Sequence, residues 1–337
     1  MLISQNMLST KITSISHYEP VRVVTNDELA KLINDKNFQV KPEIFKEKFG
    51  IVERRYARTD EQASDLAVAA ALKILNPQNI HTIDCIIFAS GSSDMIEPAT
   101  SSIIQSKLKM NCPAFDIKNA CNSFVCGLQT ANALIVSNTY KKILLLSGEK
   151  LSAIIKFSYT DTLEFVKRFA SLSMGDAGAA AIIEKSDDDS GICAQQFQTN
   201  GEYWDLCTVP GGGSLHAQDG SKVYFEGRTS EMKKVFFEKK GDLINKTISN
   251  AGWNIDDLDH IFMHHVSMNT FVEVANDLNI PVEKFYNVFE KFGNLAASSI
   301  PFAMSYALQE GKLKKGDKIM LLGLASGISI SVQLIIW

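Results

Sequence analysis

The order of apolar and polar positions predicts alternating strands and helices. Continuous apolar runs at 83–90 and 142–147 are typical of strands that are covered on both faces. Apolar residues that recur at three- and four-residue spacing, as at 64–75, are typical of helices. The other expected elements are a strand and turn at 11–25, a helix that begins at Thr25 or Asn26, a helix at 98–109, and strands at 114–118 and 174–183. The alternation indicates an α/β fold.

The second half of the chain repeats this order. Residues 258–265 resemble 83–90 at an offset of 175 residues, and 316–323 resemble 141–147 at an offset of 176. Because the two registers agree within one residue, we read the chain as an internal repeat. No low-complexity linker divides it, so both parts are expected to fold as one unit.

The repeat predicts two buried helices at the centre of the fold. At an offset of 176, Cys121 falls on Ala297, and the helix after Cys121 falls on residues 296–308. We therefore expect two similar halves, 1–185 and 186–337, packed face to face with these helices between them.

Composition narrows the class of protein. The 337 residues are 45% hydrophobic, which is ample for a core, and the net charge of −4 gives no reason to expect nucleic acid or an anionic membrane as a partner. Residues 1–11 lack the basic region and apolar run of a signal peptide, and no stretch approaches the roughly 20 apolar residues of a membrane span. The six cysteines form no CxxC pair, so reduced thiols are expected rather than disulfides or a zinc site. We expect a soluble cytoplasmic protein.

The stretch 116–135 contains the first candidate for chemistry. It reads as the end of a strand, a tight bend with Cys121, and a helix that is apolar on nearly all sides and therefore buried. At such a bend, unpaired backbone N–H groups and the helix dipole favour a thiolate, which makes Cys121 a candidate nucleophile. A free cysteine is also commonly a small packed core residue. The pattern alone leaves both interpretations open.

Candidate partners for Cys121 come from the second half. A cysteine nucleophile needs groups that stabilise negative charge and transfer protons. Three residues stand at the ends of predicted segments in the second half, and the repeat places these ends near the Cys121 bend. They are His264, Asn294 and Ser326. For His264 alone, a histidine with satisfied partners near the surface is the alternative. The neighbouring His265 does not indicate a metal site, because adjacent strand residues point to opposite faces.

Several short motifs agree in order and spacing with one family. They are GIVER at 50–54, PAT at 98–100, DIKNACNSF at 116–124, GE at 148–149, GDAGA at 175–179 and GNLAAS at 293–298, with His264. On these motifs, essentially the whole chain resembles a ketoacyl synthase III-type condensing enzyme of the thiolase superfamily. The resemblance implies a five-layered α-β-α-β-α thiolase fold of two pseudo-repeated halves, a homodimer, and a catalytic centre of Cys121, His264 and Asn294. It implies no metal and no cofactor, because the acyl substrates are carried as coenzyme A or acyl-carrier-protein thioesters.

The resemblance also implies a division of labour. Cys121 attacks a thioester carbonyl and holds the first acyl group. The amide N–H groups of Cys121 and Ser326 stabilise the oxyanion; the family usually has glycine at the second position, but a backbone donor needs no particular side chain. His264 and Asn294 donate hydrogen bonds to the thioester oxygen of the second substrate.

One departure from the family concerns the carrier of the first acyl group. Enzymes that initiate fatty-acid synthesis commonly stack a tryptophan on the adenine of coenzyme A, where this chain has Ile44, and it has Lys48 where arginine is usual. Lys48 and Arg168 are expected at the entrance for coenzyme A or for the phosphopantetheine of a carrier. An acidic acyl carrier protein is an expected partner that would dock on Lys46, Lys48, Lys167 and Arg168. Solvated surface charges are the alternative.

Glu97 is the second departure. It precedes Pro98 and lies 24 residues before Cys121, in the segment that crosses the dimer interface in this family. A glutamate there resembles the head-to-head condensing enzymes of olefin biosynthesis and the stand-alone ketosynthases that form α-pyrones, in which a glutamate from the partner subunit reaches the active site. A carboxylate in an apolar tunnel would have a raised pKa and could act as a base at the α-carbon. An ordinary surface glutamate is the alternative.

These resemblances together imply an acyltransferase of specialised metabolism. It would join two acyl thioesters by Claisen condensation through a cysteine-bound acyl intermediate, with a β-ketoacyl, α-pyrone or head-to-head product. The alternatives are decarboxylative initiation of fatty-acid synthesis, as by a ketoacyl-ACP synthase III, and ester- or amide-forming acyl transfer on the same scaffold. The loop 210–214 (PGGGS) lacks the lysine of a P-loop and is expected near the substrate tunnel.

Overall fold

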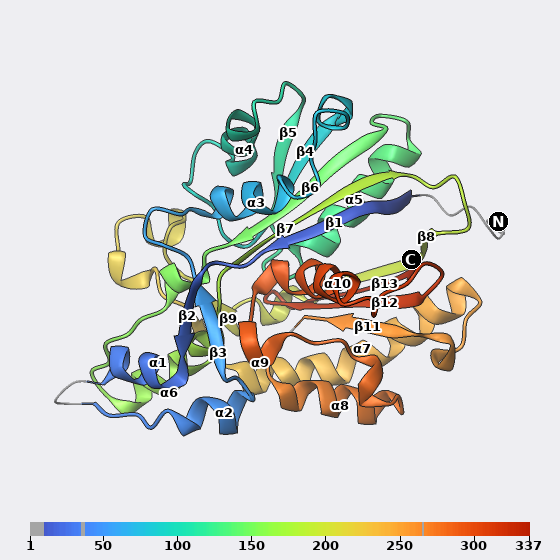
Figure 1. Ribbon diagram of the computed structural model, residues 1–337. Coiled ribbons are helices and arrows are strands. Elements are labelled where there is room, and N and C mark those ends of the chain that lie inside the picture. The colour runs from blue at the N-terminus through green and yellow to red at the C-terminus, as the bar shows by residue number, and fades with distance from the viewer. Residues whose placement is uncertain (1–9, 35–37, 265) are drawn as a thin grey trace.

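Two mixed β-sheets form the body of the molecule (Figure 1). The structure is a computed structural model that describes residues 10–34, 38–264 and 266–337. The strand order is β1-β7-β6-β4-β5 in the first sheet and β11-β12-β13-β8 in the second. The strands are β1 (Thr10–Tyr18), β4 (Cys85–Ala89), β5 (Ala114–Ile117), β6 (Lys142–Glu149) and β7 (Ala177–Lys185), then β8 (Gly191–Thr199), β11 (His260–Met263), β12 (Lys318–Ala325) and β13 (Ser329–Ile336).

Helices cover both sheets and separate them, so that five layers result (Figure 1). The outer face of the first sheet carries α3 (Ala63–Ala71) and α4 (Thr100–Leu108), the central layer contains α5 (Ser123–Val136) and α10 (Ser299–Gln309), and the second sheet carries α7 (Thr229–Ala251) and α8 (Met268–Leu278). This arrangement confirms the predicted α-β-α-β-α fold with two buried helices at its centre.

Strand β6 shows why a continuous apolar run predicts a strand with no polar face. Leu144 and Leu146 pack with α3 and α4 on the outside, whereas Ile143 and Leu145 pack with the central helices. All four side chains are fully buried. Each such burial contributes about 1.5–3 kcal/mol, so one strand holds two helical layers.

The two sheets repeat one topology. β4 and β6 pair in parallel, as do β11 and β12, and β7 and β13 then pair antiparallel to β6 and β12. β1 and β8 complete the sheets by antiparallel pairing. In the second sheet, a parallel bridge joins Ile261 of β11 to Phe285. It occupies the position that β5 has beside β4 in the first sheet. The internal repeat is therefore confirmed, while a division of the chain at residues 185 and 186 stays a prediction.

A smaller group of elements lies beside the sheets (Figure 1). It contains β2 (Arg22–Thr25), β3 (Glu53–Tyr56), α1 (Asn26–Ile33), α2 (Glu43–Phe49) and α6 (Thr162–Arg168); the remaining short elements are β9 (Cys207–Thr208), β10 (Glu226–Gly227) and α9 (Phe289–Phe292). Thr25 is the N-cap of α1, because its Oγ1 accepts a hydrogen bond of 3.2 Å from the Glu28 N–H. The ring of Phe169 lies 4.7 Å from Phe49 and 5.3 Å from Phe165, so aromatic packing joins α2 to α6.

The longer elements that the sequence analysis does not predict include α7, α8, β8 and β13. Helix α7 is 23 residues long, but its buried face includes Lys240 and Thr247, which interrupt the apolar periodicity. The strand expected at 258–265 is β11, from His260 to Met263. His265, the second residue of the adjacent histidine pair, lies outside the described residues.

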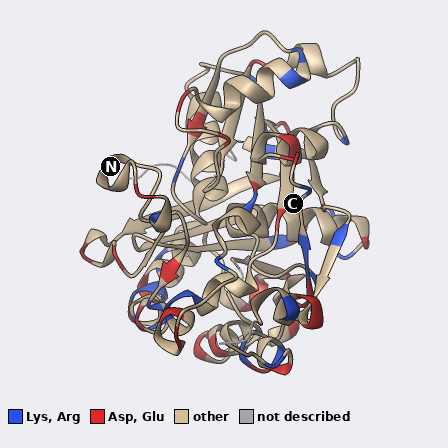
Figure 2. Cartoon of the chain, turned by 90° about the vertical axis from the view of Figure 1, so that its left-hand side faces the viewer, with Lys and Arg blue, Asp and Glu red and all other residues tan. Residues whose placement is uncertain are grey.

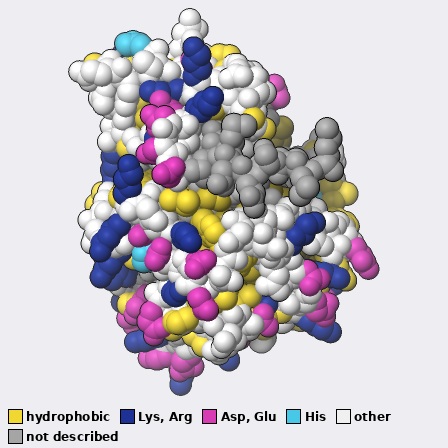
Figure 3. Space-filling model, turned by 90° about the vertical axis from the view of Figure 1, so that its right-hand side faces the viewer, with side chains coloured by type: hydrophobic (Ala, Val, Ile, Leu, Met, Phe, Trp, Pro, Cys, Tyr) yellow, Lys and Arg dark blue, Asp and Glu magenta, His cyan; other side chains and the backbone are white. Residues whose placement is uncertain are grey.

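Charged residues of both signs are interspersed along the chain. Figure 2 shows this on the side that carries α1, α2 and α6, and Figure 3 shows it on the opposite side. Such mixing agrees with the small net charge of −4. Among the helices in the described ranges, none has the length and apolar character needed to cross a membrane.

Candidate active site

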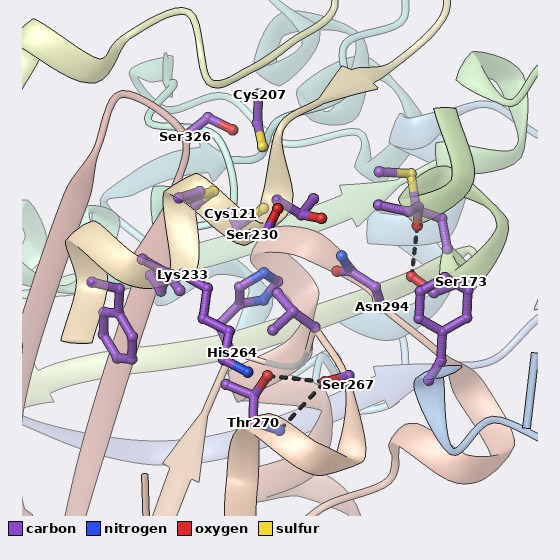
Figure 4. A pocket seen from close by; sticks show the side chains of 18 of the residues that line it. Cys121, Ser173, Cys207, Ser230, Lys233, His264, Ser267, Thr270, Asn294 and Ser326 are labelled. Atoms are coloured by element: carbon purple, nitrogen blue, oxygen red, sulfur yellow. Dashed lines mark hydrogen bonds between the residues drawn. The ribbon is translucent and has the colours of Figure 1, made fainter. Parts of the chain in front are cut away.

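A cavity of about 250 Å³ opens where strands of the second sheet end, beside α2, α7 and α8 (Figure 4). Apolar side chains such as Phe49, Met232 and Phe236 alternate in its lining with a few polar ones, a composition typical of ligand sites. The lining includes five of the seven site residues that the sequence predicts, namely Lys48, Cys121, His264, Asn294 and Ser326. These residues come from both halves of the chain, as the repeat predicts.

Cys121 lies on a strained bend between β5 and α5. Ala120, which precedes it, has a left-handed backbone with φ of 46°, a conformation that non-glycine residues rarely adopt. Ser123 stabilises the bend, because its Oγ accepts a hydrogen bond of 2.8 Å from the Asn119 N–H and donates one of 2.7 Å to the Ala120 carbonyl. The bend places the Cys121 side chain at the cavity (Figure 4).

Asn122 attaches this bend to the second sheet. Its buried amide donates to Ser329 Oγ at 3.1 Å and accepts from Ser331 Oγ at 2.6 Å. Gly323 leaves the necessary room, since a Cβ at that position would stand 1.9 Å from the Asn122 Oδ1. The nucleophile candidate is thereby positioned against the strands that end at the cavity.

Burial raises the pKa of the Cys121 thiol, and the Glu149 carboxylate and Cys207 raise it further. The expectation that the helix dipole favours a thiolate in the resting protein is therefore wrong, because desolvation of the charged sulfur outweighs it. Cys121 is a thiol at neutral pH, and it needs a proton acceptor before it can attack a carbonyl.

His264 directly follows β11 and is held through its backbone and one ring nitrogen. Its N–H donates to the Leu322 carbonyl at 3.0 Å, and its Nδ1 lies 3.3 Å from Ser299 Oγ. Burial lowers the pKa of His264 to about 4, although a backbone hydrogen bond with Ala296 acts in the opposite direction. The imidazole is therefore neutral at pH 7, and with Nδ1 engaged its Nε2 is the nitrogen left for the cavity.

Asn294 presents its amide NH₂ group to the same cavity. Its Oδ1 accepts a hydrogen bond of 2.9 Å from the Ala296 N–H. Its backbone is held on both sides, since its N–H donates to the Ser173 carbonyl at 2.8 Å and its carbonyl accepts from the Gly175 N–H at 3.0 Å. Because Oδ1 is occupied, Nδ2 remains as the donor on the side of Cys121 and His264 (Figure 4).

Two backbone N–H groups at the cavity have no protein acceptor. Within the described parts of the chain, neither the Cys121 N–H nor the Ser326 N–H donates to another residue. Ser326 stands in the tight turn between β12 and β13, where Gly327 has φ of 125°. Unpaired backbone donors beside a nucleophile are what an oxyanion requires.

Glu97 and Arg168 do not line the cavity of their own chain. Glu97 is exposed on the loop between β4 and α4, where its neighbour Ile96 is 81% exposed. Arg168 is buried; its Nη2 donates to Glu226 at 2.8 Å, and its guanidinium lies over the Tyr224 ring at 5.6 Å. The charge of Arg168 is thus already paired inside the protein, and a role at the substrate entrance stays a prediction.

Glu149 and Cys207 are close to the site although the sequence assigns them no role. The sulfur of Cys207 points into the cavity (Figure 4). Glu149 belongs to the GE motif at 148–149 and ends the apolar strand β6. A carboxylate that directly continues such a run is a signal that could have drawn attention to it, because glutamate is rarely buried.

Comparisons with known proteins identify relatives over nearly the whole chain. Residues 115–201 match the family model described as 3-oxoacyl-[acyl-carrier-protein (ACP)] synthase III, and residues 248–337 match the model of its C-terminal part. The chain is 31% identical to a beta-ketoacyl-[acyl-carrier-protein] synthase III from Rickettsia bellii, over 98% of this chain and 100% of the relative. A solved variant of OleA from Xanthomonas campestris matches with a TM-score of 0.89 and 25% identity, over 99% of this chain and 100% of that one. The 3-oxoacyl-[acyl-carrier-protein] synthase III from Aquifex aeolicus matches with a TM-score of 0.84 and 28% identity, over 97% of this chain and 100% of that one.

Proposed function

This chain belongs to the 3-oxoacyl-[acyl-carrier-protein] synthase III family of Claisen-condensing acyltransferases, and we propose that it joins two acyl thioesters without loss of CO₂. In this function Cys121 is the nucleophile, and His264 and Asn294 stabilise the second substrate. Glu97 of a second copy of the chain is the base. The positions of Cys121, His264 and Asn294 around one cavity, and the chemistry that each can perform, support their roles.

Acylation begins at the Cys121 thiol, whose proton passes to the neutral imidazole of His264. The sulfur attacks the carbonyl carbon of the first thioester, and the N–H groups of Cys121 and Ser326 donate to the oxygen as it becomes negative. The carbon–sulfur bond to the carrier then breaks, and the departing carrier thiolate takes the proton from His264. The products are an acyl-Cys121 thioester and a free carrier thiol.

Condensation begins when the second thioester places its carbonyl oxygen against Asn294 Nδ2 and His264 Nε2. Glu97 of the second copy removes a proton from the α-carbon, and both donors stabilise the resulting enolate. The α-carbon attacks the acyl-Cys121 carbonyl, so that a carbon–carbon bond forms and the carbon–sulfur bond to Cys121 breaks. The Cys121 sulfur regains the proton that Glu97 removed.

Ser299 lets His264 serve in both steps. A hydroxyl both donates and accepts hydrogen bonds. It can accept from an Nδ1–H, which leaves Nε2 free to receive the Cys121 proton. It can also donate to an unprotonated Nδ1, in which case the Nε2–H donates to the enolate oxygen. The 3.3 Å separation between Nδ1 and the Ser299 Oγ fits either arrangement.

The observation that carries the non-decarboxylative reaction is the place of Glu97. This carboxylate is exposed at the tip of its loop and outside the cavity of its own chain. Beside it, Met95 is 50% and Ile96 is 81% exposed. Neighbouring apolar side chains that stand in solvent favour burial against another surface. A homodimer that covers this loop would bring Glu97 into the second copy's cavity.

The experiment that tests this base is Glu97→Gln. The amide keeps the size of the side chain but cannot take a proton, so the condensed product should fall by about 100-fold or more while acyl-Cys121 still forms. Intact-mass spectrometry measures the acyl-enzyme, and product mass spectrometry measures condensation. Glu283→Gln, at an exposed position, is the matched control. Condensation at the wild-type rate in Glu97→Gln would exclude the base role.

Lauroyl-CoA is the first acyl donor to test. The solved structure of one OleA variant, which matches this chain with a TM-score of 0.87, holds lauric acid and lauroyl-CoA. The mass of the product distinguishes a simple β-ketoacyl product, an α-pyrone and a head-to-head product. An acidic acyl carrier protein that docks beside Lys46 and Lys48 at the end of α2 is the second carrier to test.

Decarboxylative condensation is the second candidate function. The relative from Rickettsia bellii bears the name beta-ketoacyl-[acyl-carrier-protein] synthase III, which favours a malonyl carrier as the second substrate. Cys121, His264 and Asn294 serve that reaction equally well, but Glu97 does not take part in it. CO₂ released in step with product from a malonyl thioester, together with full activity of Glu97→Gln, would establish this candidate instead.

A further inference from the structure

Glu149 is a fully buried carboxylate at the end of β6, and none of the steps above uses it. It accepts three hydrogen bonds from a single turn: from the Gly91 N–H at 2.7 Å, from the Ser92 N–H at 3.0 Å and from the Ser92 Oγ at 2.7 Å. Within the described residues it forms no ion pair with lysine or arginine. Burial raises the pKa of its carboxyl group, and the hydrogen bonds from Ser92 and Gly91 act in the opposite direction. Burial of a carboxylate without a cationic partner is costly, so Glu149 needs an explanation other than stability.

The Glu149 carboxylate lies close to the bend that carries Cys121. Gly91 separates the two, since a Cβ at Gly91 would stand 3.4 Å from Glu149 Oε1 and 3.8 Å from the carbonyl carbon of Ala120. Only the width of one small residue therefore lies between this carboxylate and the residue before the nucleophile. After burial itself, Glu149 is the largest cause of the raised pKa of the Cys121 thiol.

The turn that Glu149 holds is also the start of the loop that carries Glu97. Further along this loop, Asp94 accepts hydrogen bonds of 3.0 and 2.5 Å from the N–H and Oγ of Ser64, and Asp116 accepts two of 2.8 Å each from the first turn of α4. Three carboxylates thus anchor the loop on both sides of its exposed tip. Of these anchors, Glu149 is the one that also adjoins the nucleophile.

We propose that Glu149 is a positioning residue for the condensation, whose buried carboxylate holds the loop that presents Glu97 and the bend that presents Cys121 in one fixed relation. This role rests on the proposed function, in which Cys121 of one copy and Glu97 of the other meet at one site. In each copy, Glu149 therefore connects Cys121, which acts in that copy's own site, to Glu97, which acts in the site of the partner. When it is ionised, Glu149 also raises the pKa of the Cys121 thiol, after the larger effect of burial.

The groups around Cys121 indicate what a substitution at position 149 would change. The ionisable neighbours of Cys121 are Glu149 from β6, Cys207 from β9, His264 after β11, Lys48 from α2 and Lys233 from α7. Burial raises the pKa of Cys207 to about 11 and lowers that of His264 to about 4, so both are neutral at pH 7. Among these groups Glu149 is the carboxylic acid, and Glu149→Gln makes this position permanently neutral at nearly constant volume.

The experiment compares Glu149→Gln with Asp94→Asn. In Glu149→Gln, alkylation of Cys121 by iodoacetamide at pH 7.5 should be about tenfold faster, which corresponds to a fall of one unit in the thiol pKa. Condensation from a preformed acyl-enzyme should slow by about tenfold or more, because the turn before Glu97 loses its anchor. Asp94→Asn loosens the same loop, and Asp94 is not among the groups that shift the pKa of Cys121, so this variant should slow condensation but leave alkylation at the wild-type rate. Wild-type alkylation together with wild-type condensation in Glu149→Gln would overturn the proposal.

Two further variants make the test decisive. Glu149→Asp keeps the carboxyl group but shortens the side chain, so alkylation should return to the wild-type rate while condensation stays slow.

Ser92→Ala removes one of the three hydrogen bonds to Glu149 without changing an ionisable side chain. It covers the case in which Glu149→Gln does not fold. The loosened turn should slow condensation by about threefold; condensation at the wild-type rate in this variant would overturn the proposal. If wild-type protein forms no acyl-Cys121, the proposed function fails, whereas the alkylation rates still report the effect of Glu149 on the thiol.

Discussion

Ala120 and Ala296 adopt the same left-handed backbone conformation at equivalent positions of the two halves, with φ of 46° and 44°. They are 176 residues apart, which is the offset of the internal repeat. Ala120 precedes Cys121 and α5, and the N–H of Ala296 holds the Asn294 Oδ1 before α10. One kind of strained bend therefore positions the nucleophile candidate in the first half and the amide donor in the second.

Ala120→Val should destabilise the protein. A β-branched residue at positive φ is strained, so we expect a loss of about 1–3 kcal/mol, seen as a lower urea midpoint of unfolding. Ala120→Gly is the control, because glycine adopts this conformation without strain and should unfold within about 1 kcal/mol of the wild type. Equal midpoints for the two variants would show that the bend is unstrained.

Alkylation of Cys121 should rise steeply with pH. Because burial and Glu149 raise the thiol pKa above its usual value, the rate with iodoacetamide should increase about tenfold per unit between pH 7 and 9. Peptide mass spectrometry follows the label on Cys121, and Cys121→Ser gives the background from the other cysteines. A plateau below pH 8 would contradict a resting thiol.

Asn294→Asp should separate the two half-reactions. The carboxylate can still accept from the Ala296 N–H, so the bend is kept, but a donor to the second substrate is replaced by a negative charge. Loss of one such donor costs about 100-fold or more in rate. We expect single-turnover condensation to fall by this factor while acylation of Cys121 changes by less than about threefold. A comparable loss in acylation would assign Asn294 to the first step.

Mixed dimers should show whether Glu97 acts across the interface. Cys121→Ala and Glu97→Gln should each be inactive in condensation. After the two variants are mixed and allowed to exchange subunits, half of the dimers contain one site with both groups intact, so about a quarter of wild-type activity should return. Product mass spectrometry on the mixture makes the measurement, with each variant alone as the control. Activity that never returns, despite exchange seen by native mass spectrometry, would place Glu97 in the site of its own chain.

His17 should make the fold sensitive to acid. Its Nδ1 lies 2.9 Å from Ser305 Oγ, its ring lies 4.3 Å from the Phe302 ring, and burial lowers its pKa to about 4. The unfolded chain therefore binds more protons than the folded one between about pH 6.5 and 4, and up to about 3 kcal/mol of stability is lost as the pH falls through this window.

The comparison for this effect is His17→Phe, which keeps the ring contact. It should lower stability at pH 8 by about 1 kcal/mol, because Ser305 loses its partner, but its urea midpoint should depend less on pH between 6.5 and 4. Part of the dependence should remain in the variant, since His264 has a pKa lowered in the same direction. Parallel midpoint curves for the variant and the wild type would contradict this account.

The sequence alone determines the architecture, because the signals for it are local. A strand buried on both faces, such as β6, must be apolar at every position, and a helix such as α1 needs a side-chain acceptor at its start, which Thr25 supplies. The repeat then brings Cys121, His264, Asn294 and Ser326 to one cavity, as predicted. Helix α7 is not recognisable in this way, because Lys240 and Thr247 occupy its buried face.

Only the tertiary structure decides the electrostatics of the site. The helix dipole at Cys121 is readable from the sequence, but the burial and the Glu149 charge that outweigh it come from segments distant along the chain. The same holds for Arg168, whose charge is taken up by Glu226 from another loop. Desolvation and Coulomb interactions act through space, so no pattern of neighbouring residues specifies them. For that reason the sequence identifies Cys121 as a nucleophile candidate, but it does not determine the protonation state of the Cys121 side chain before a substrate binds.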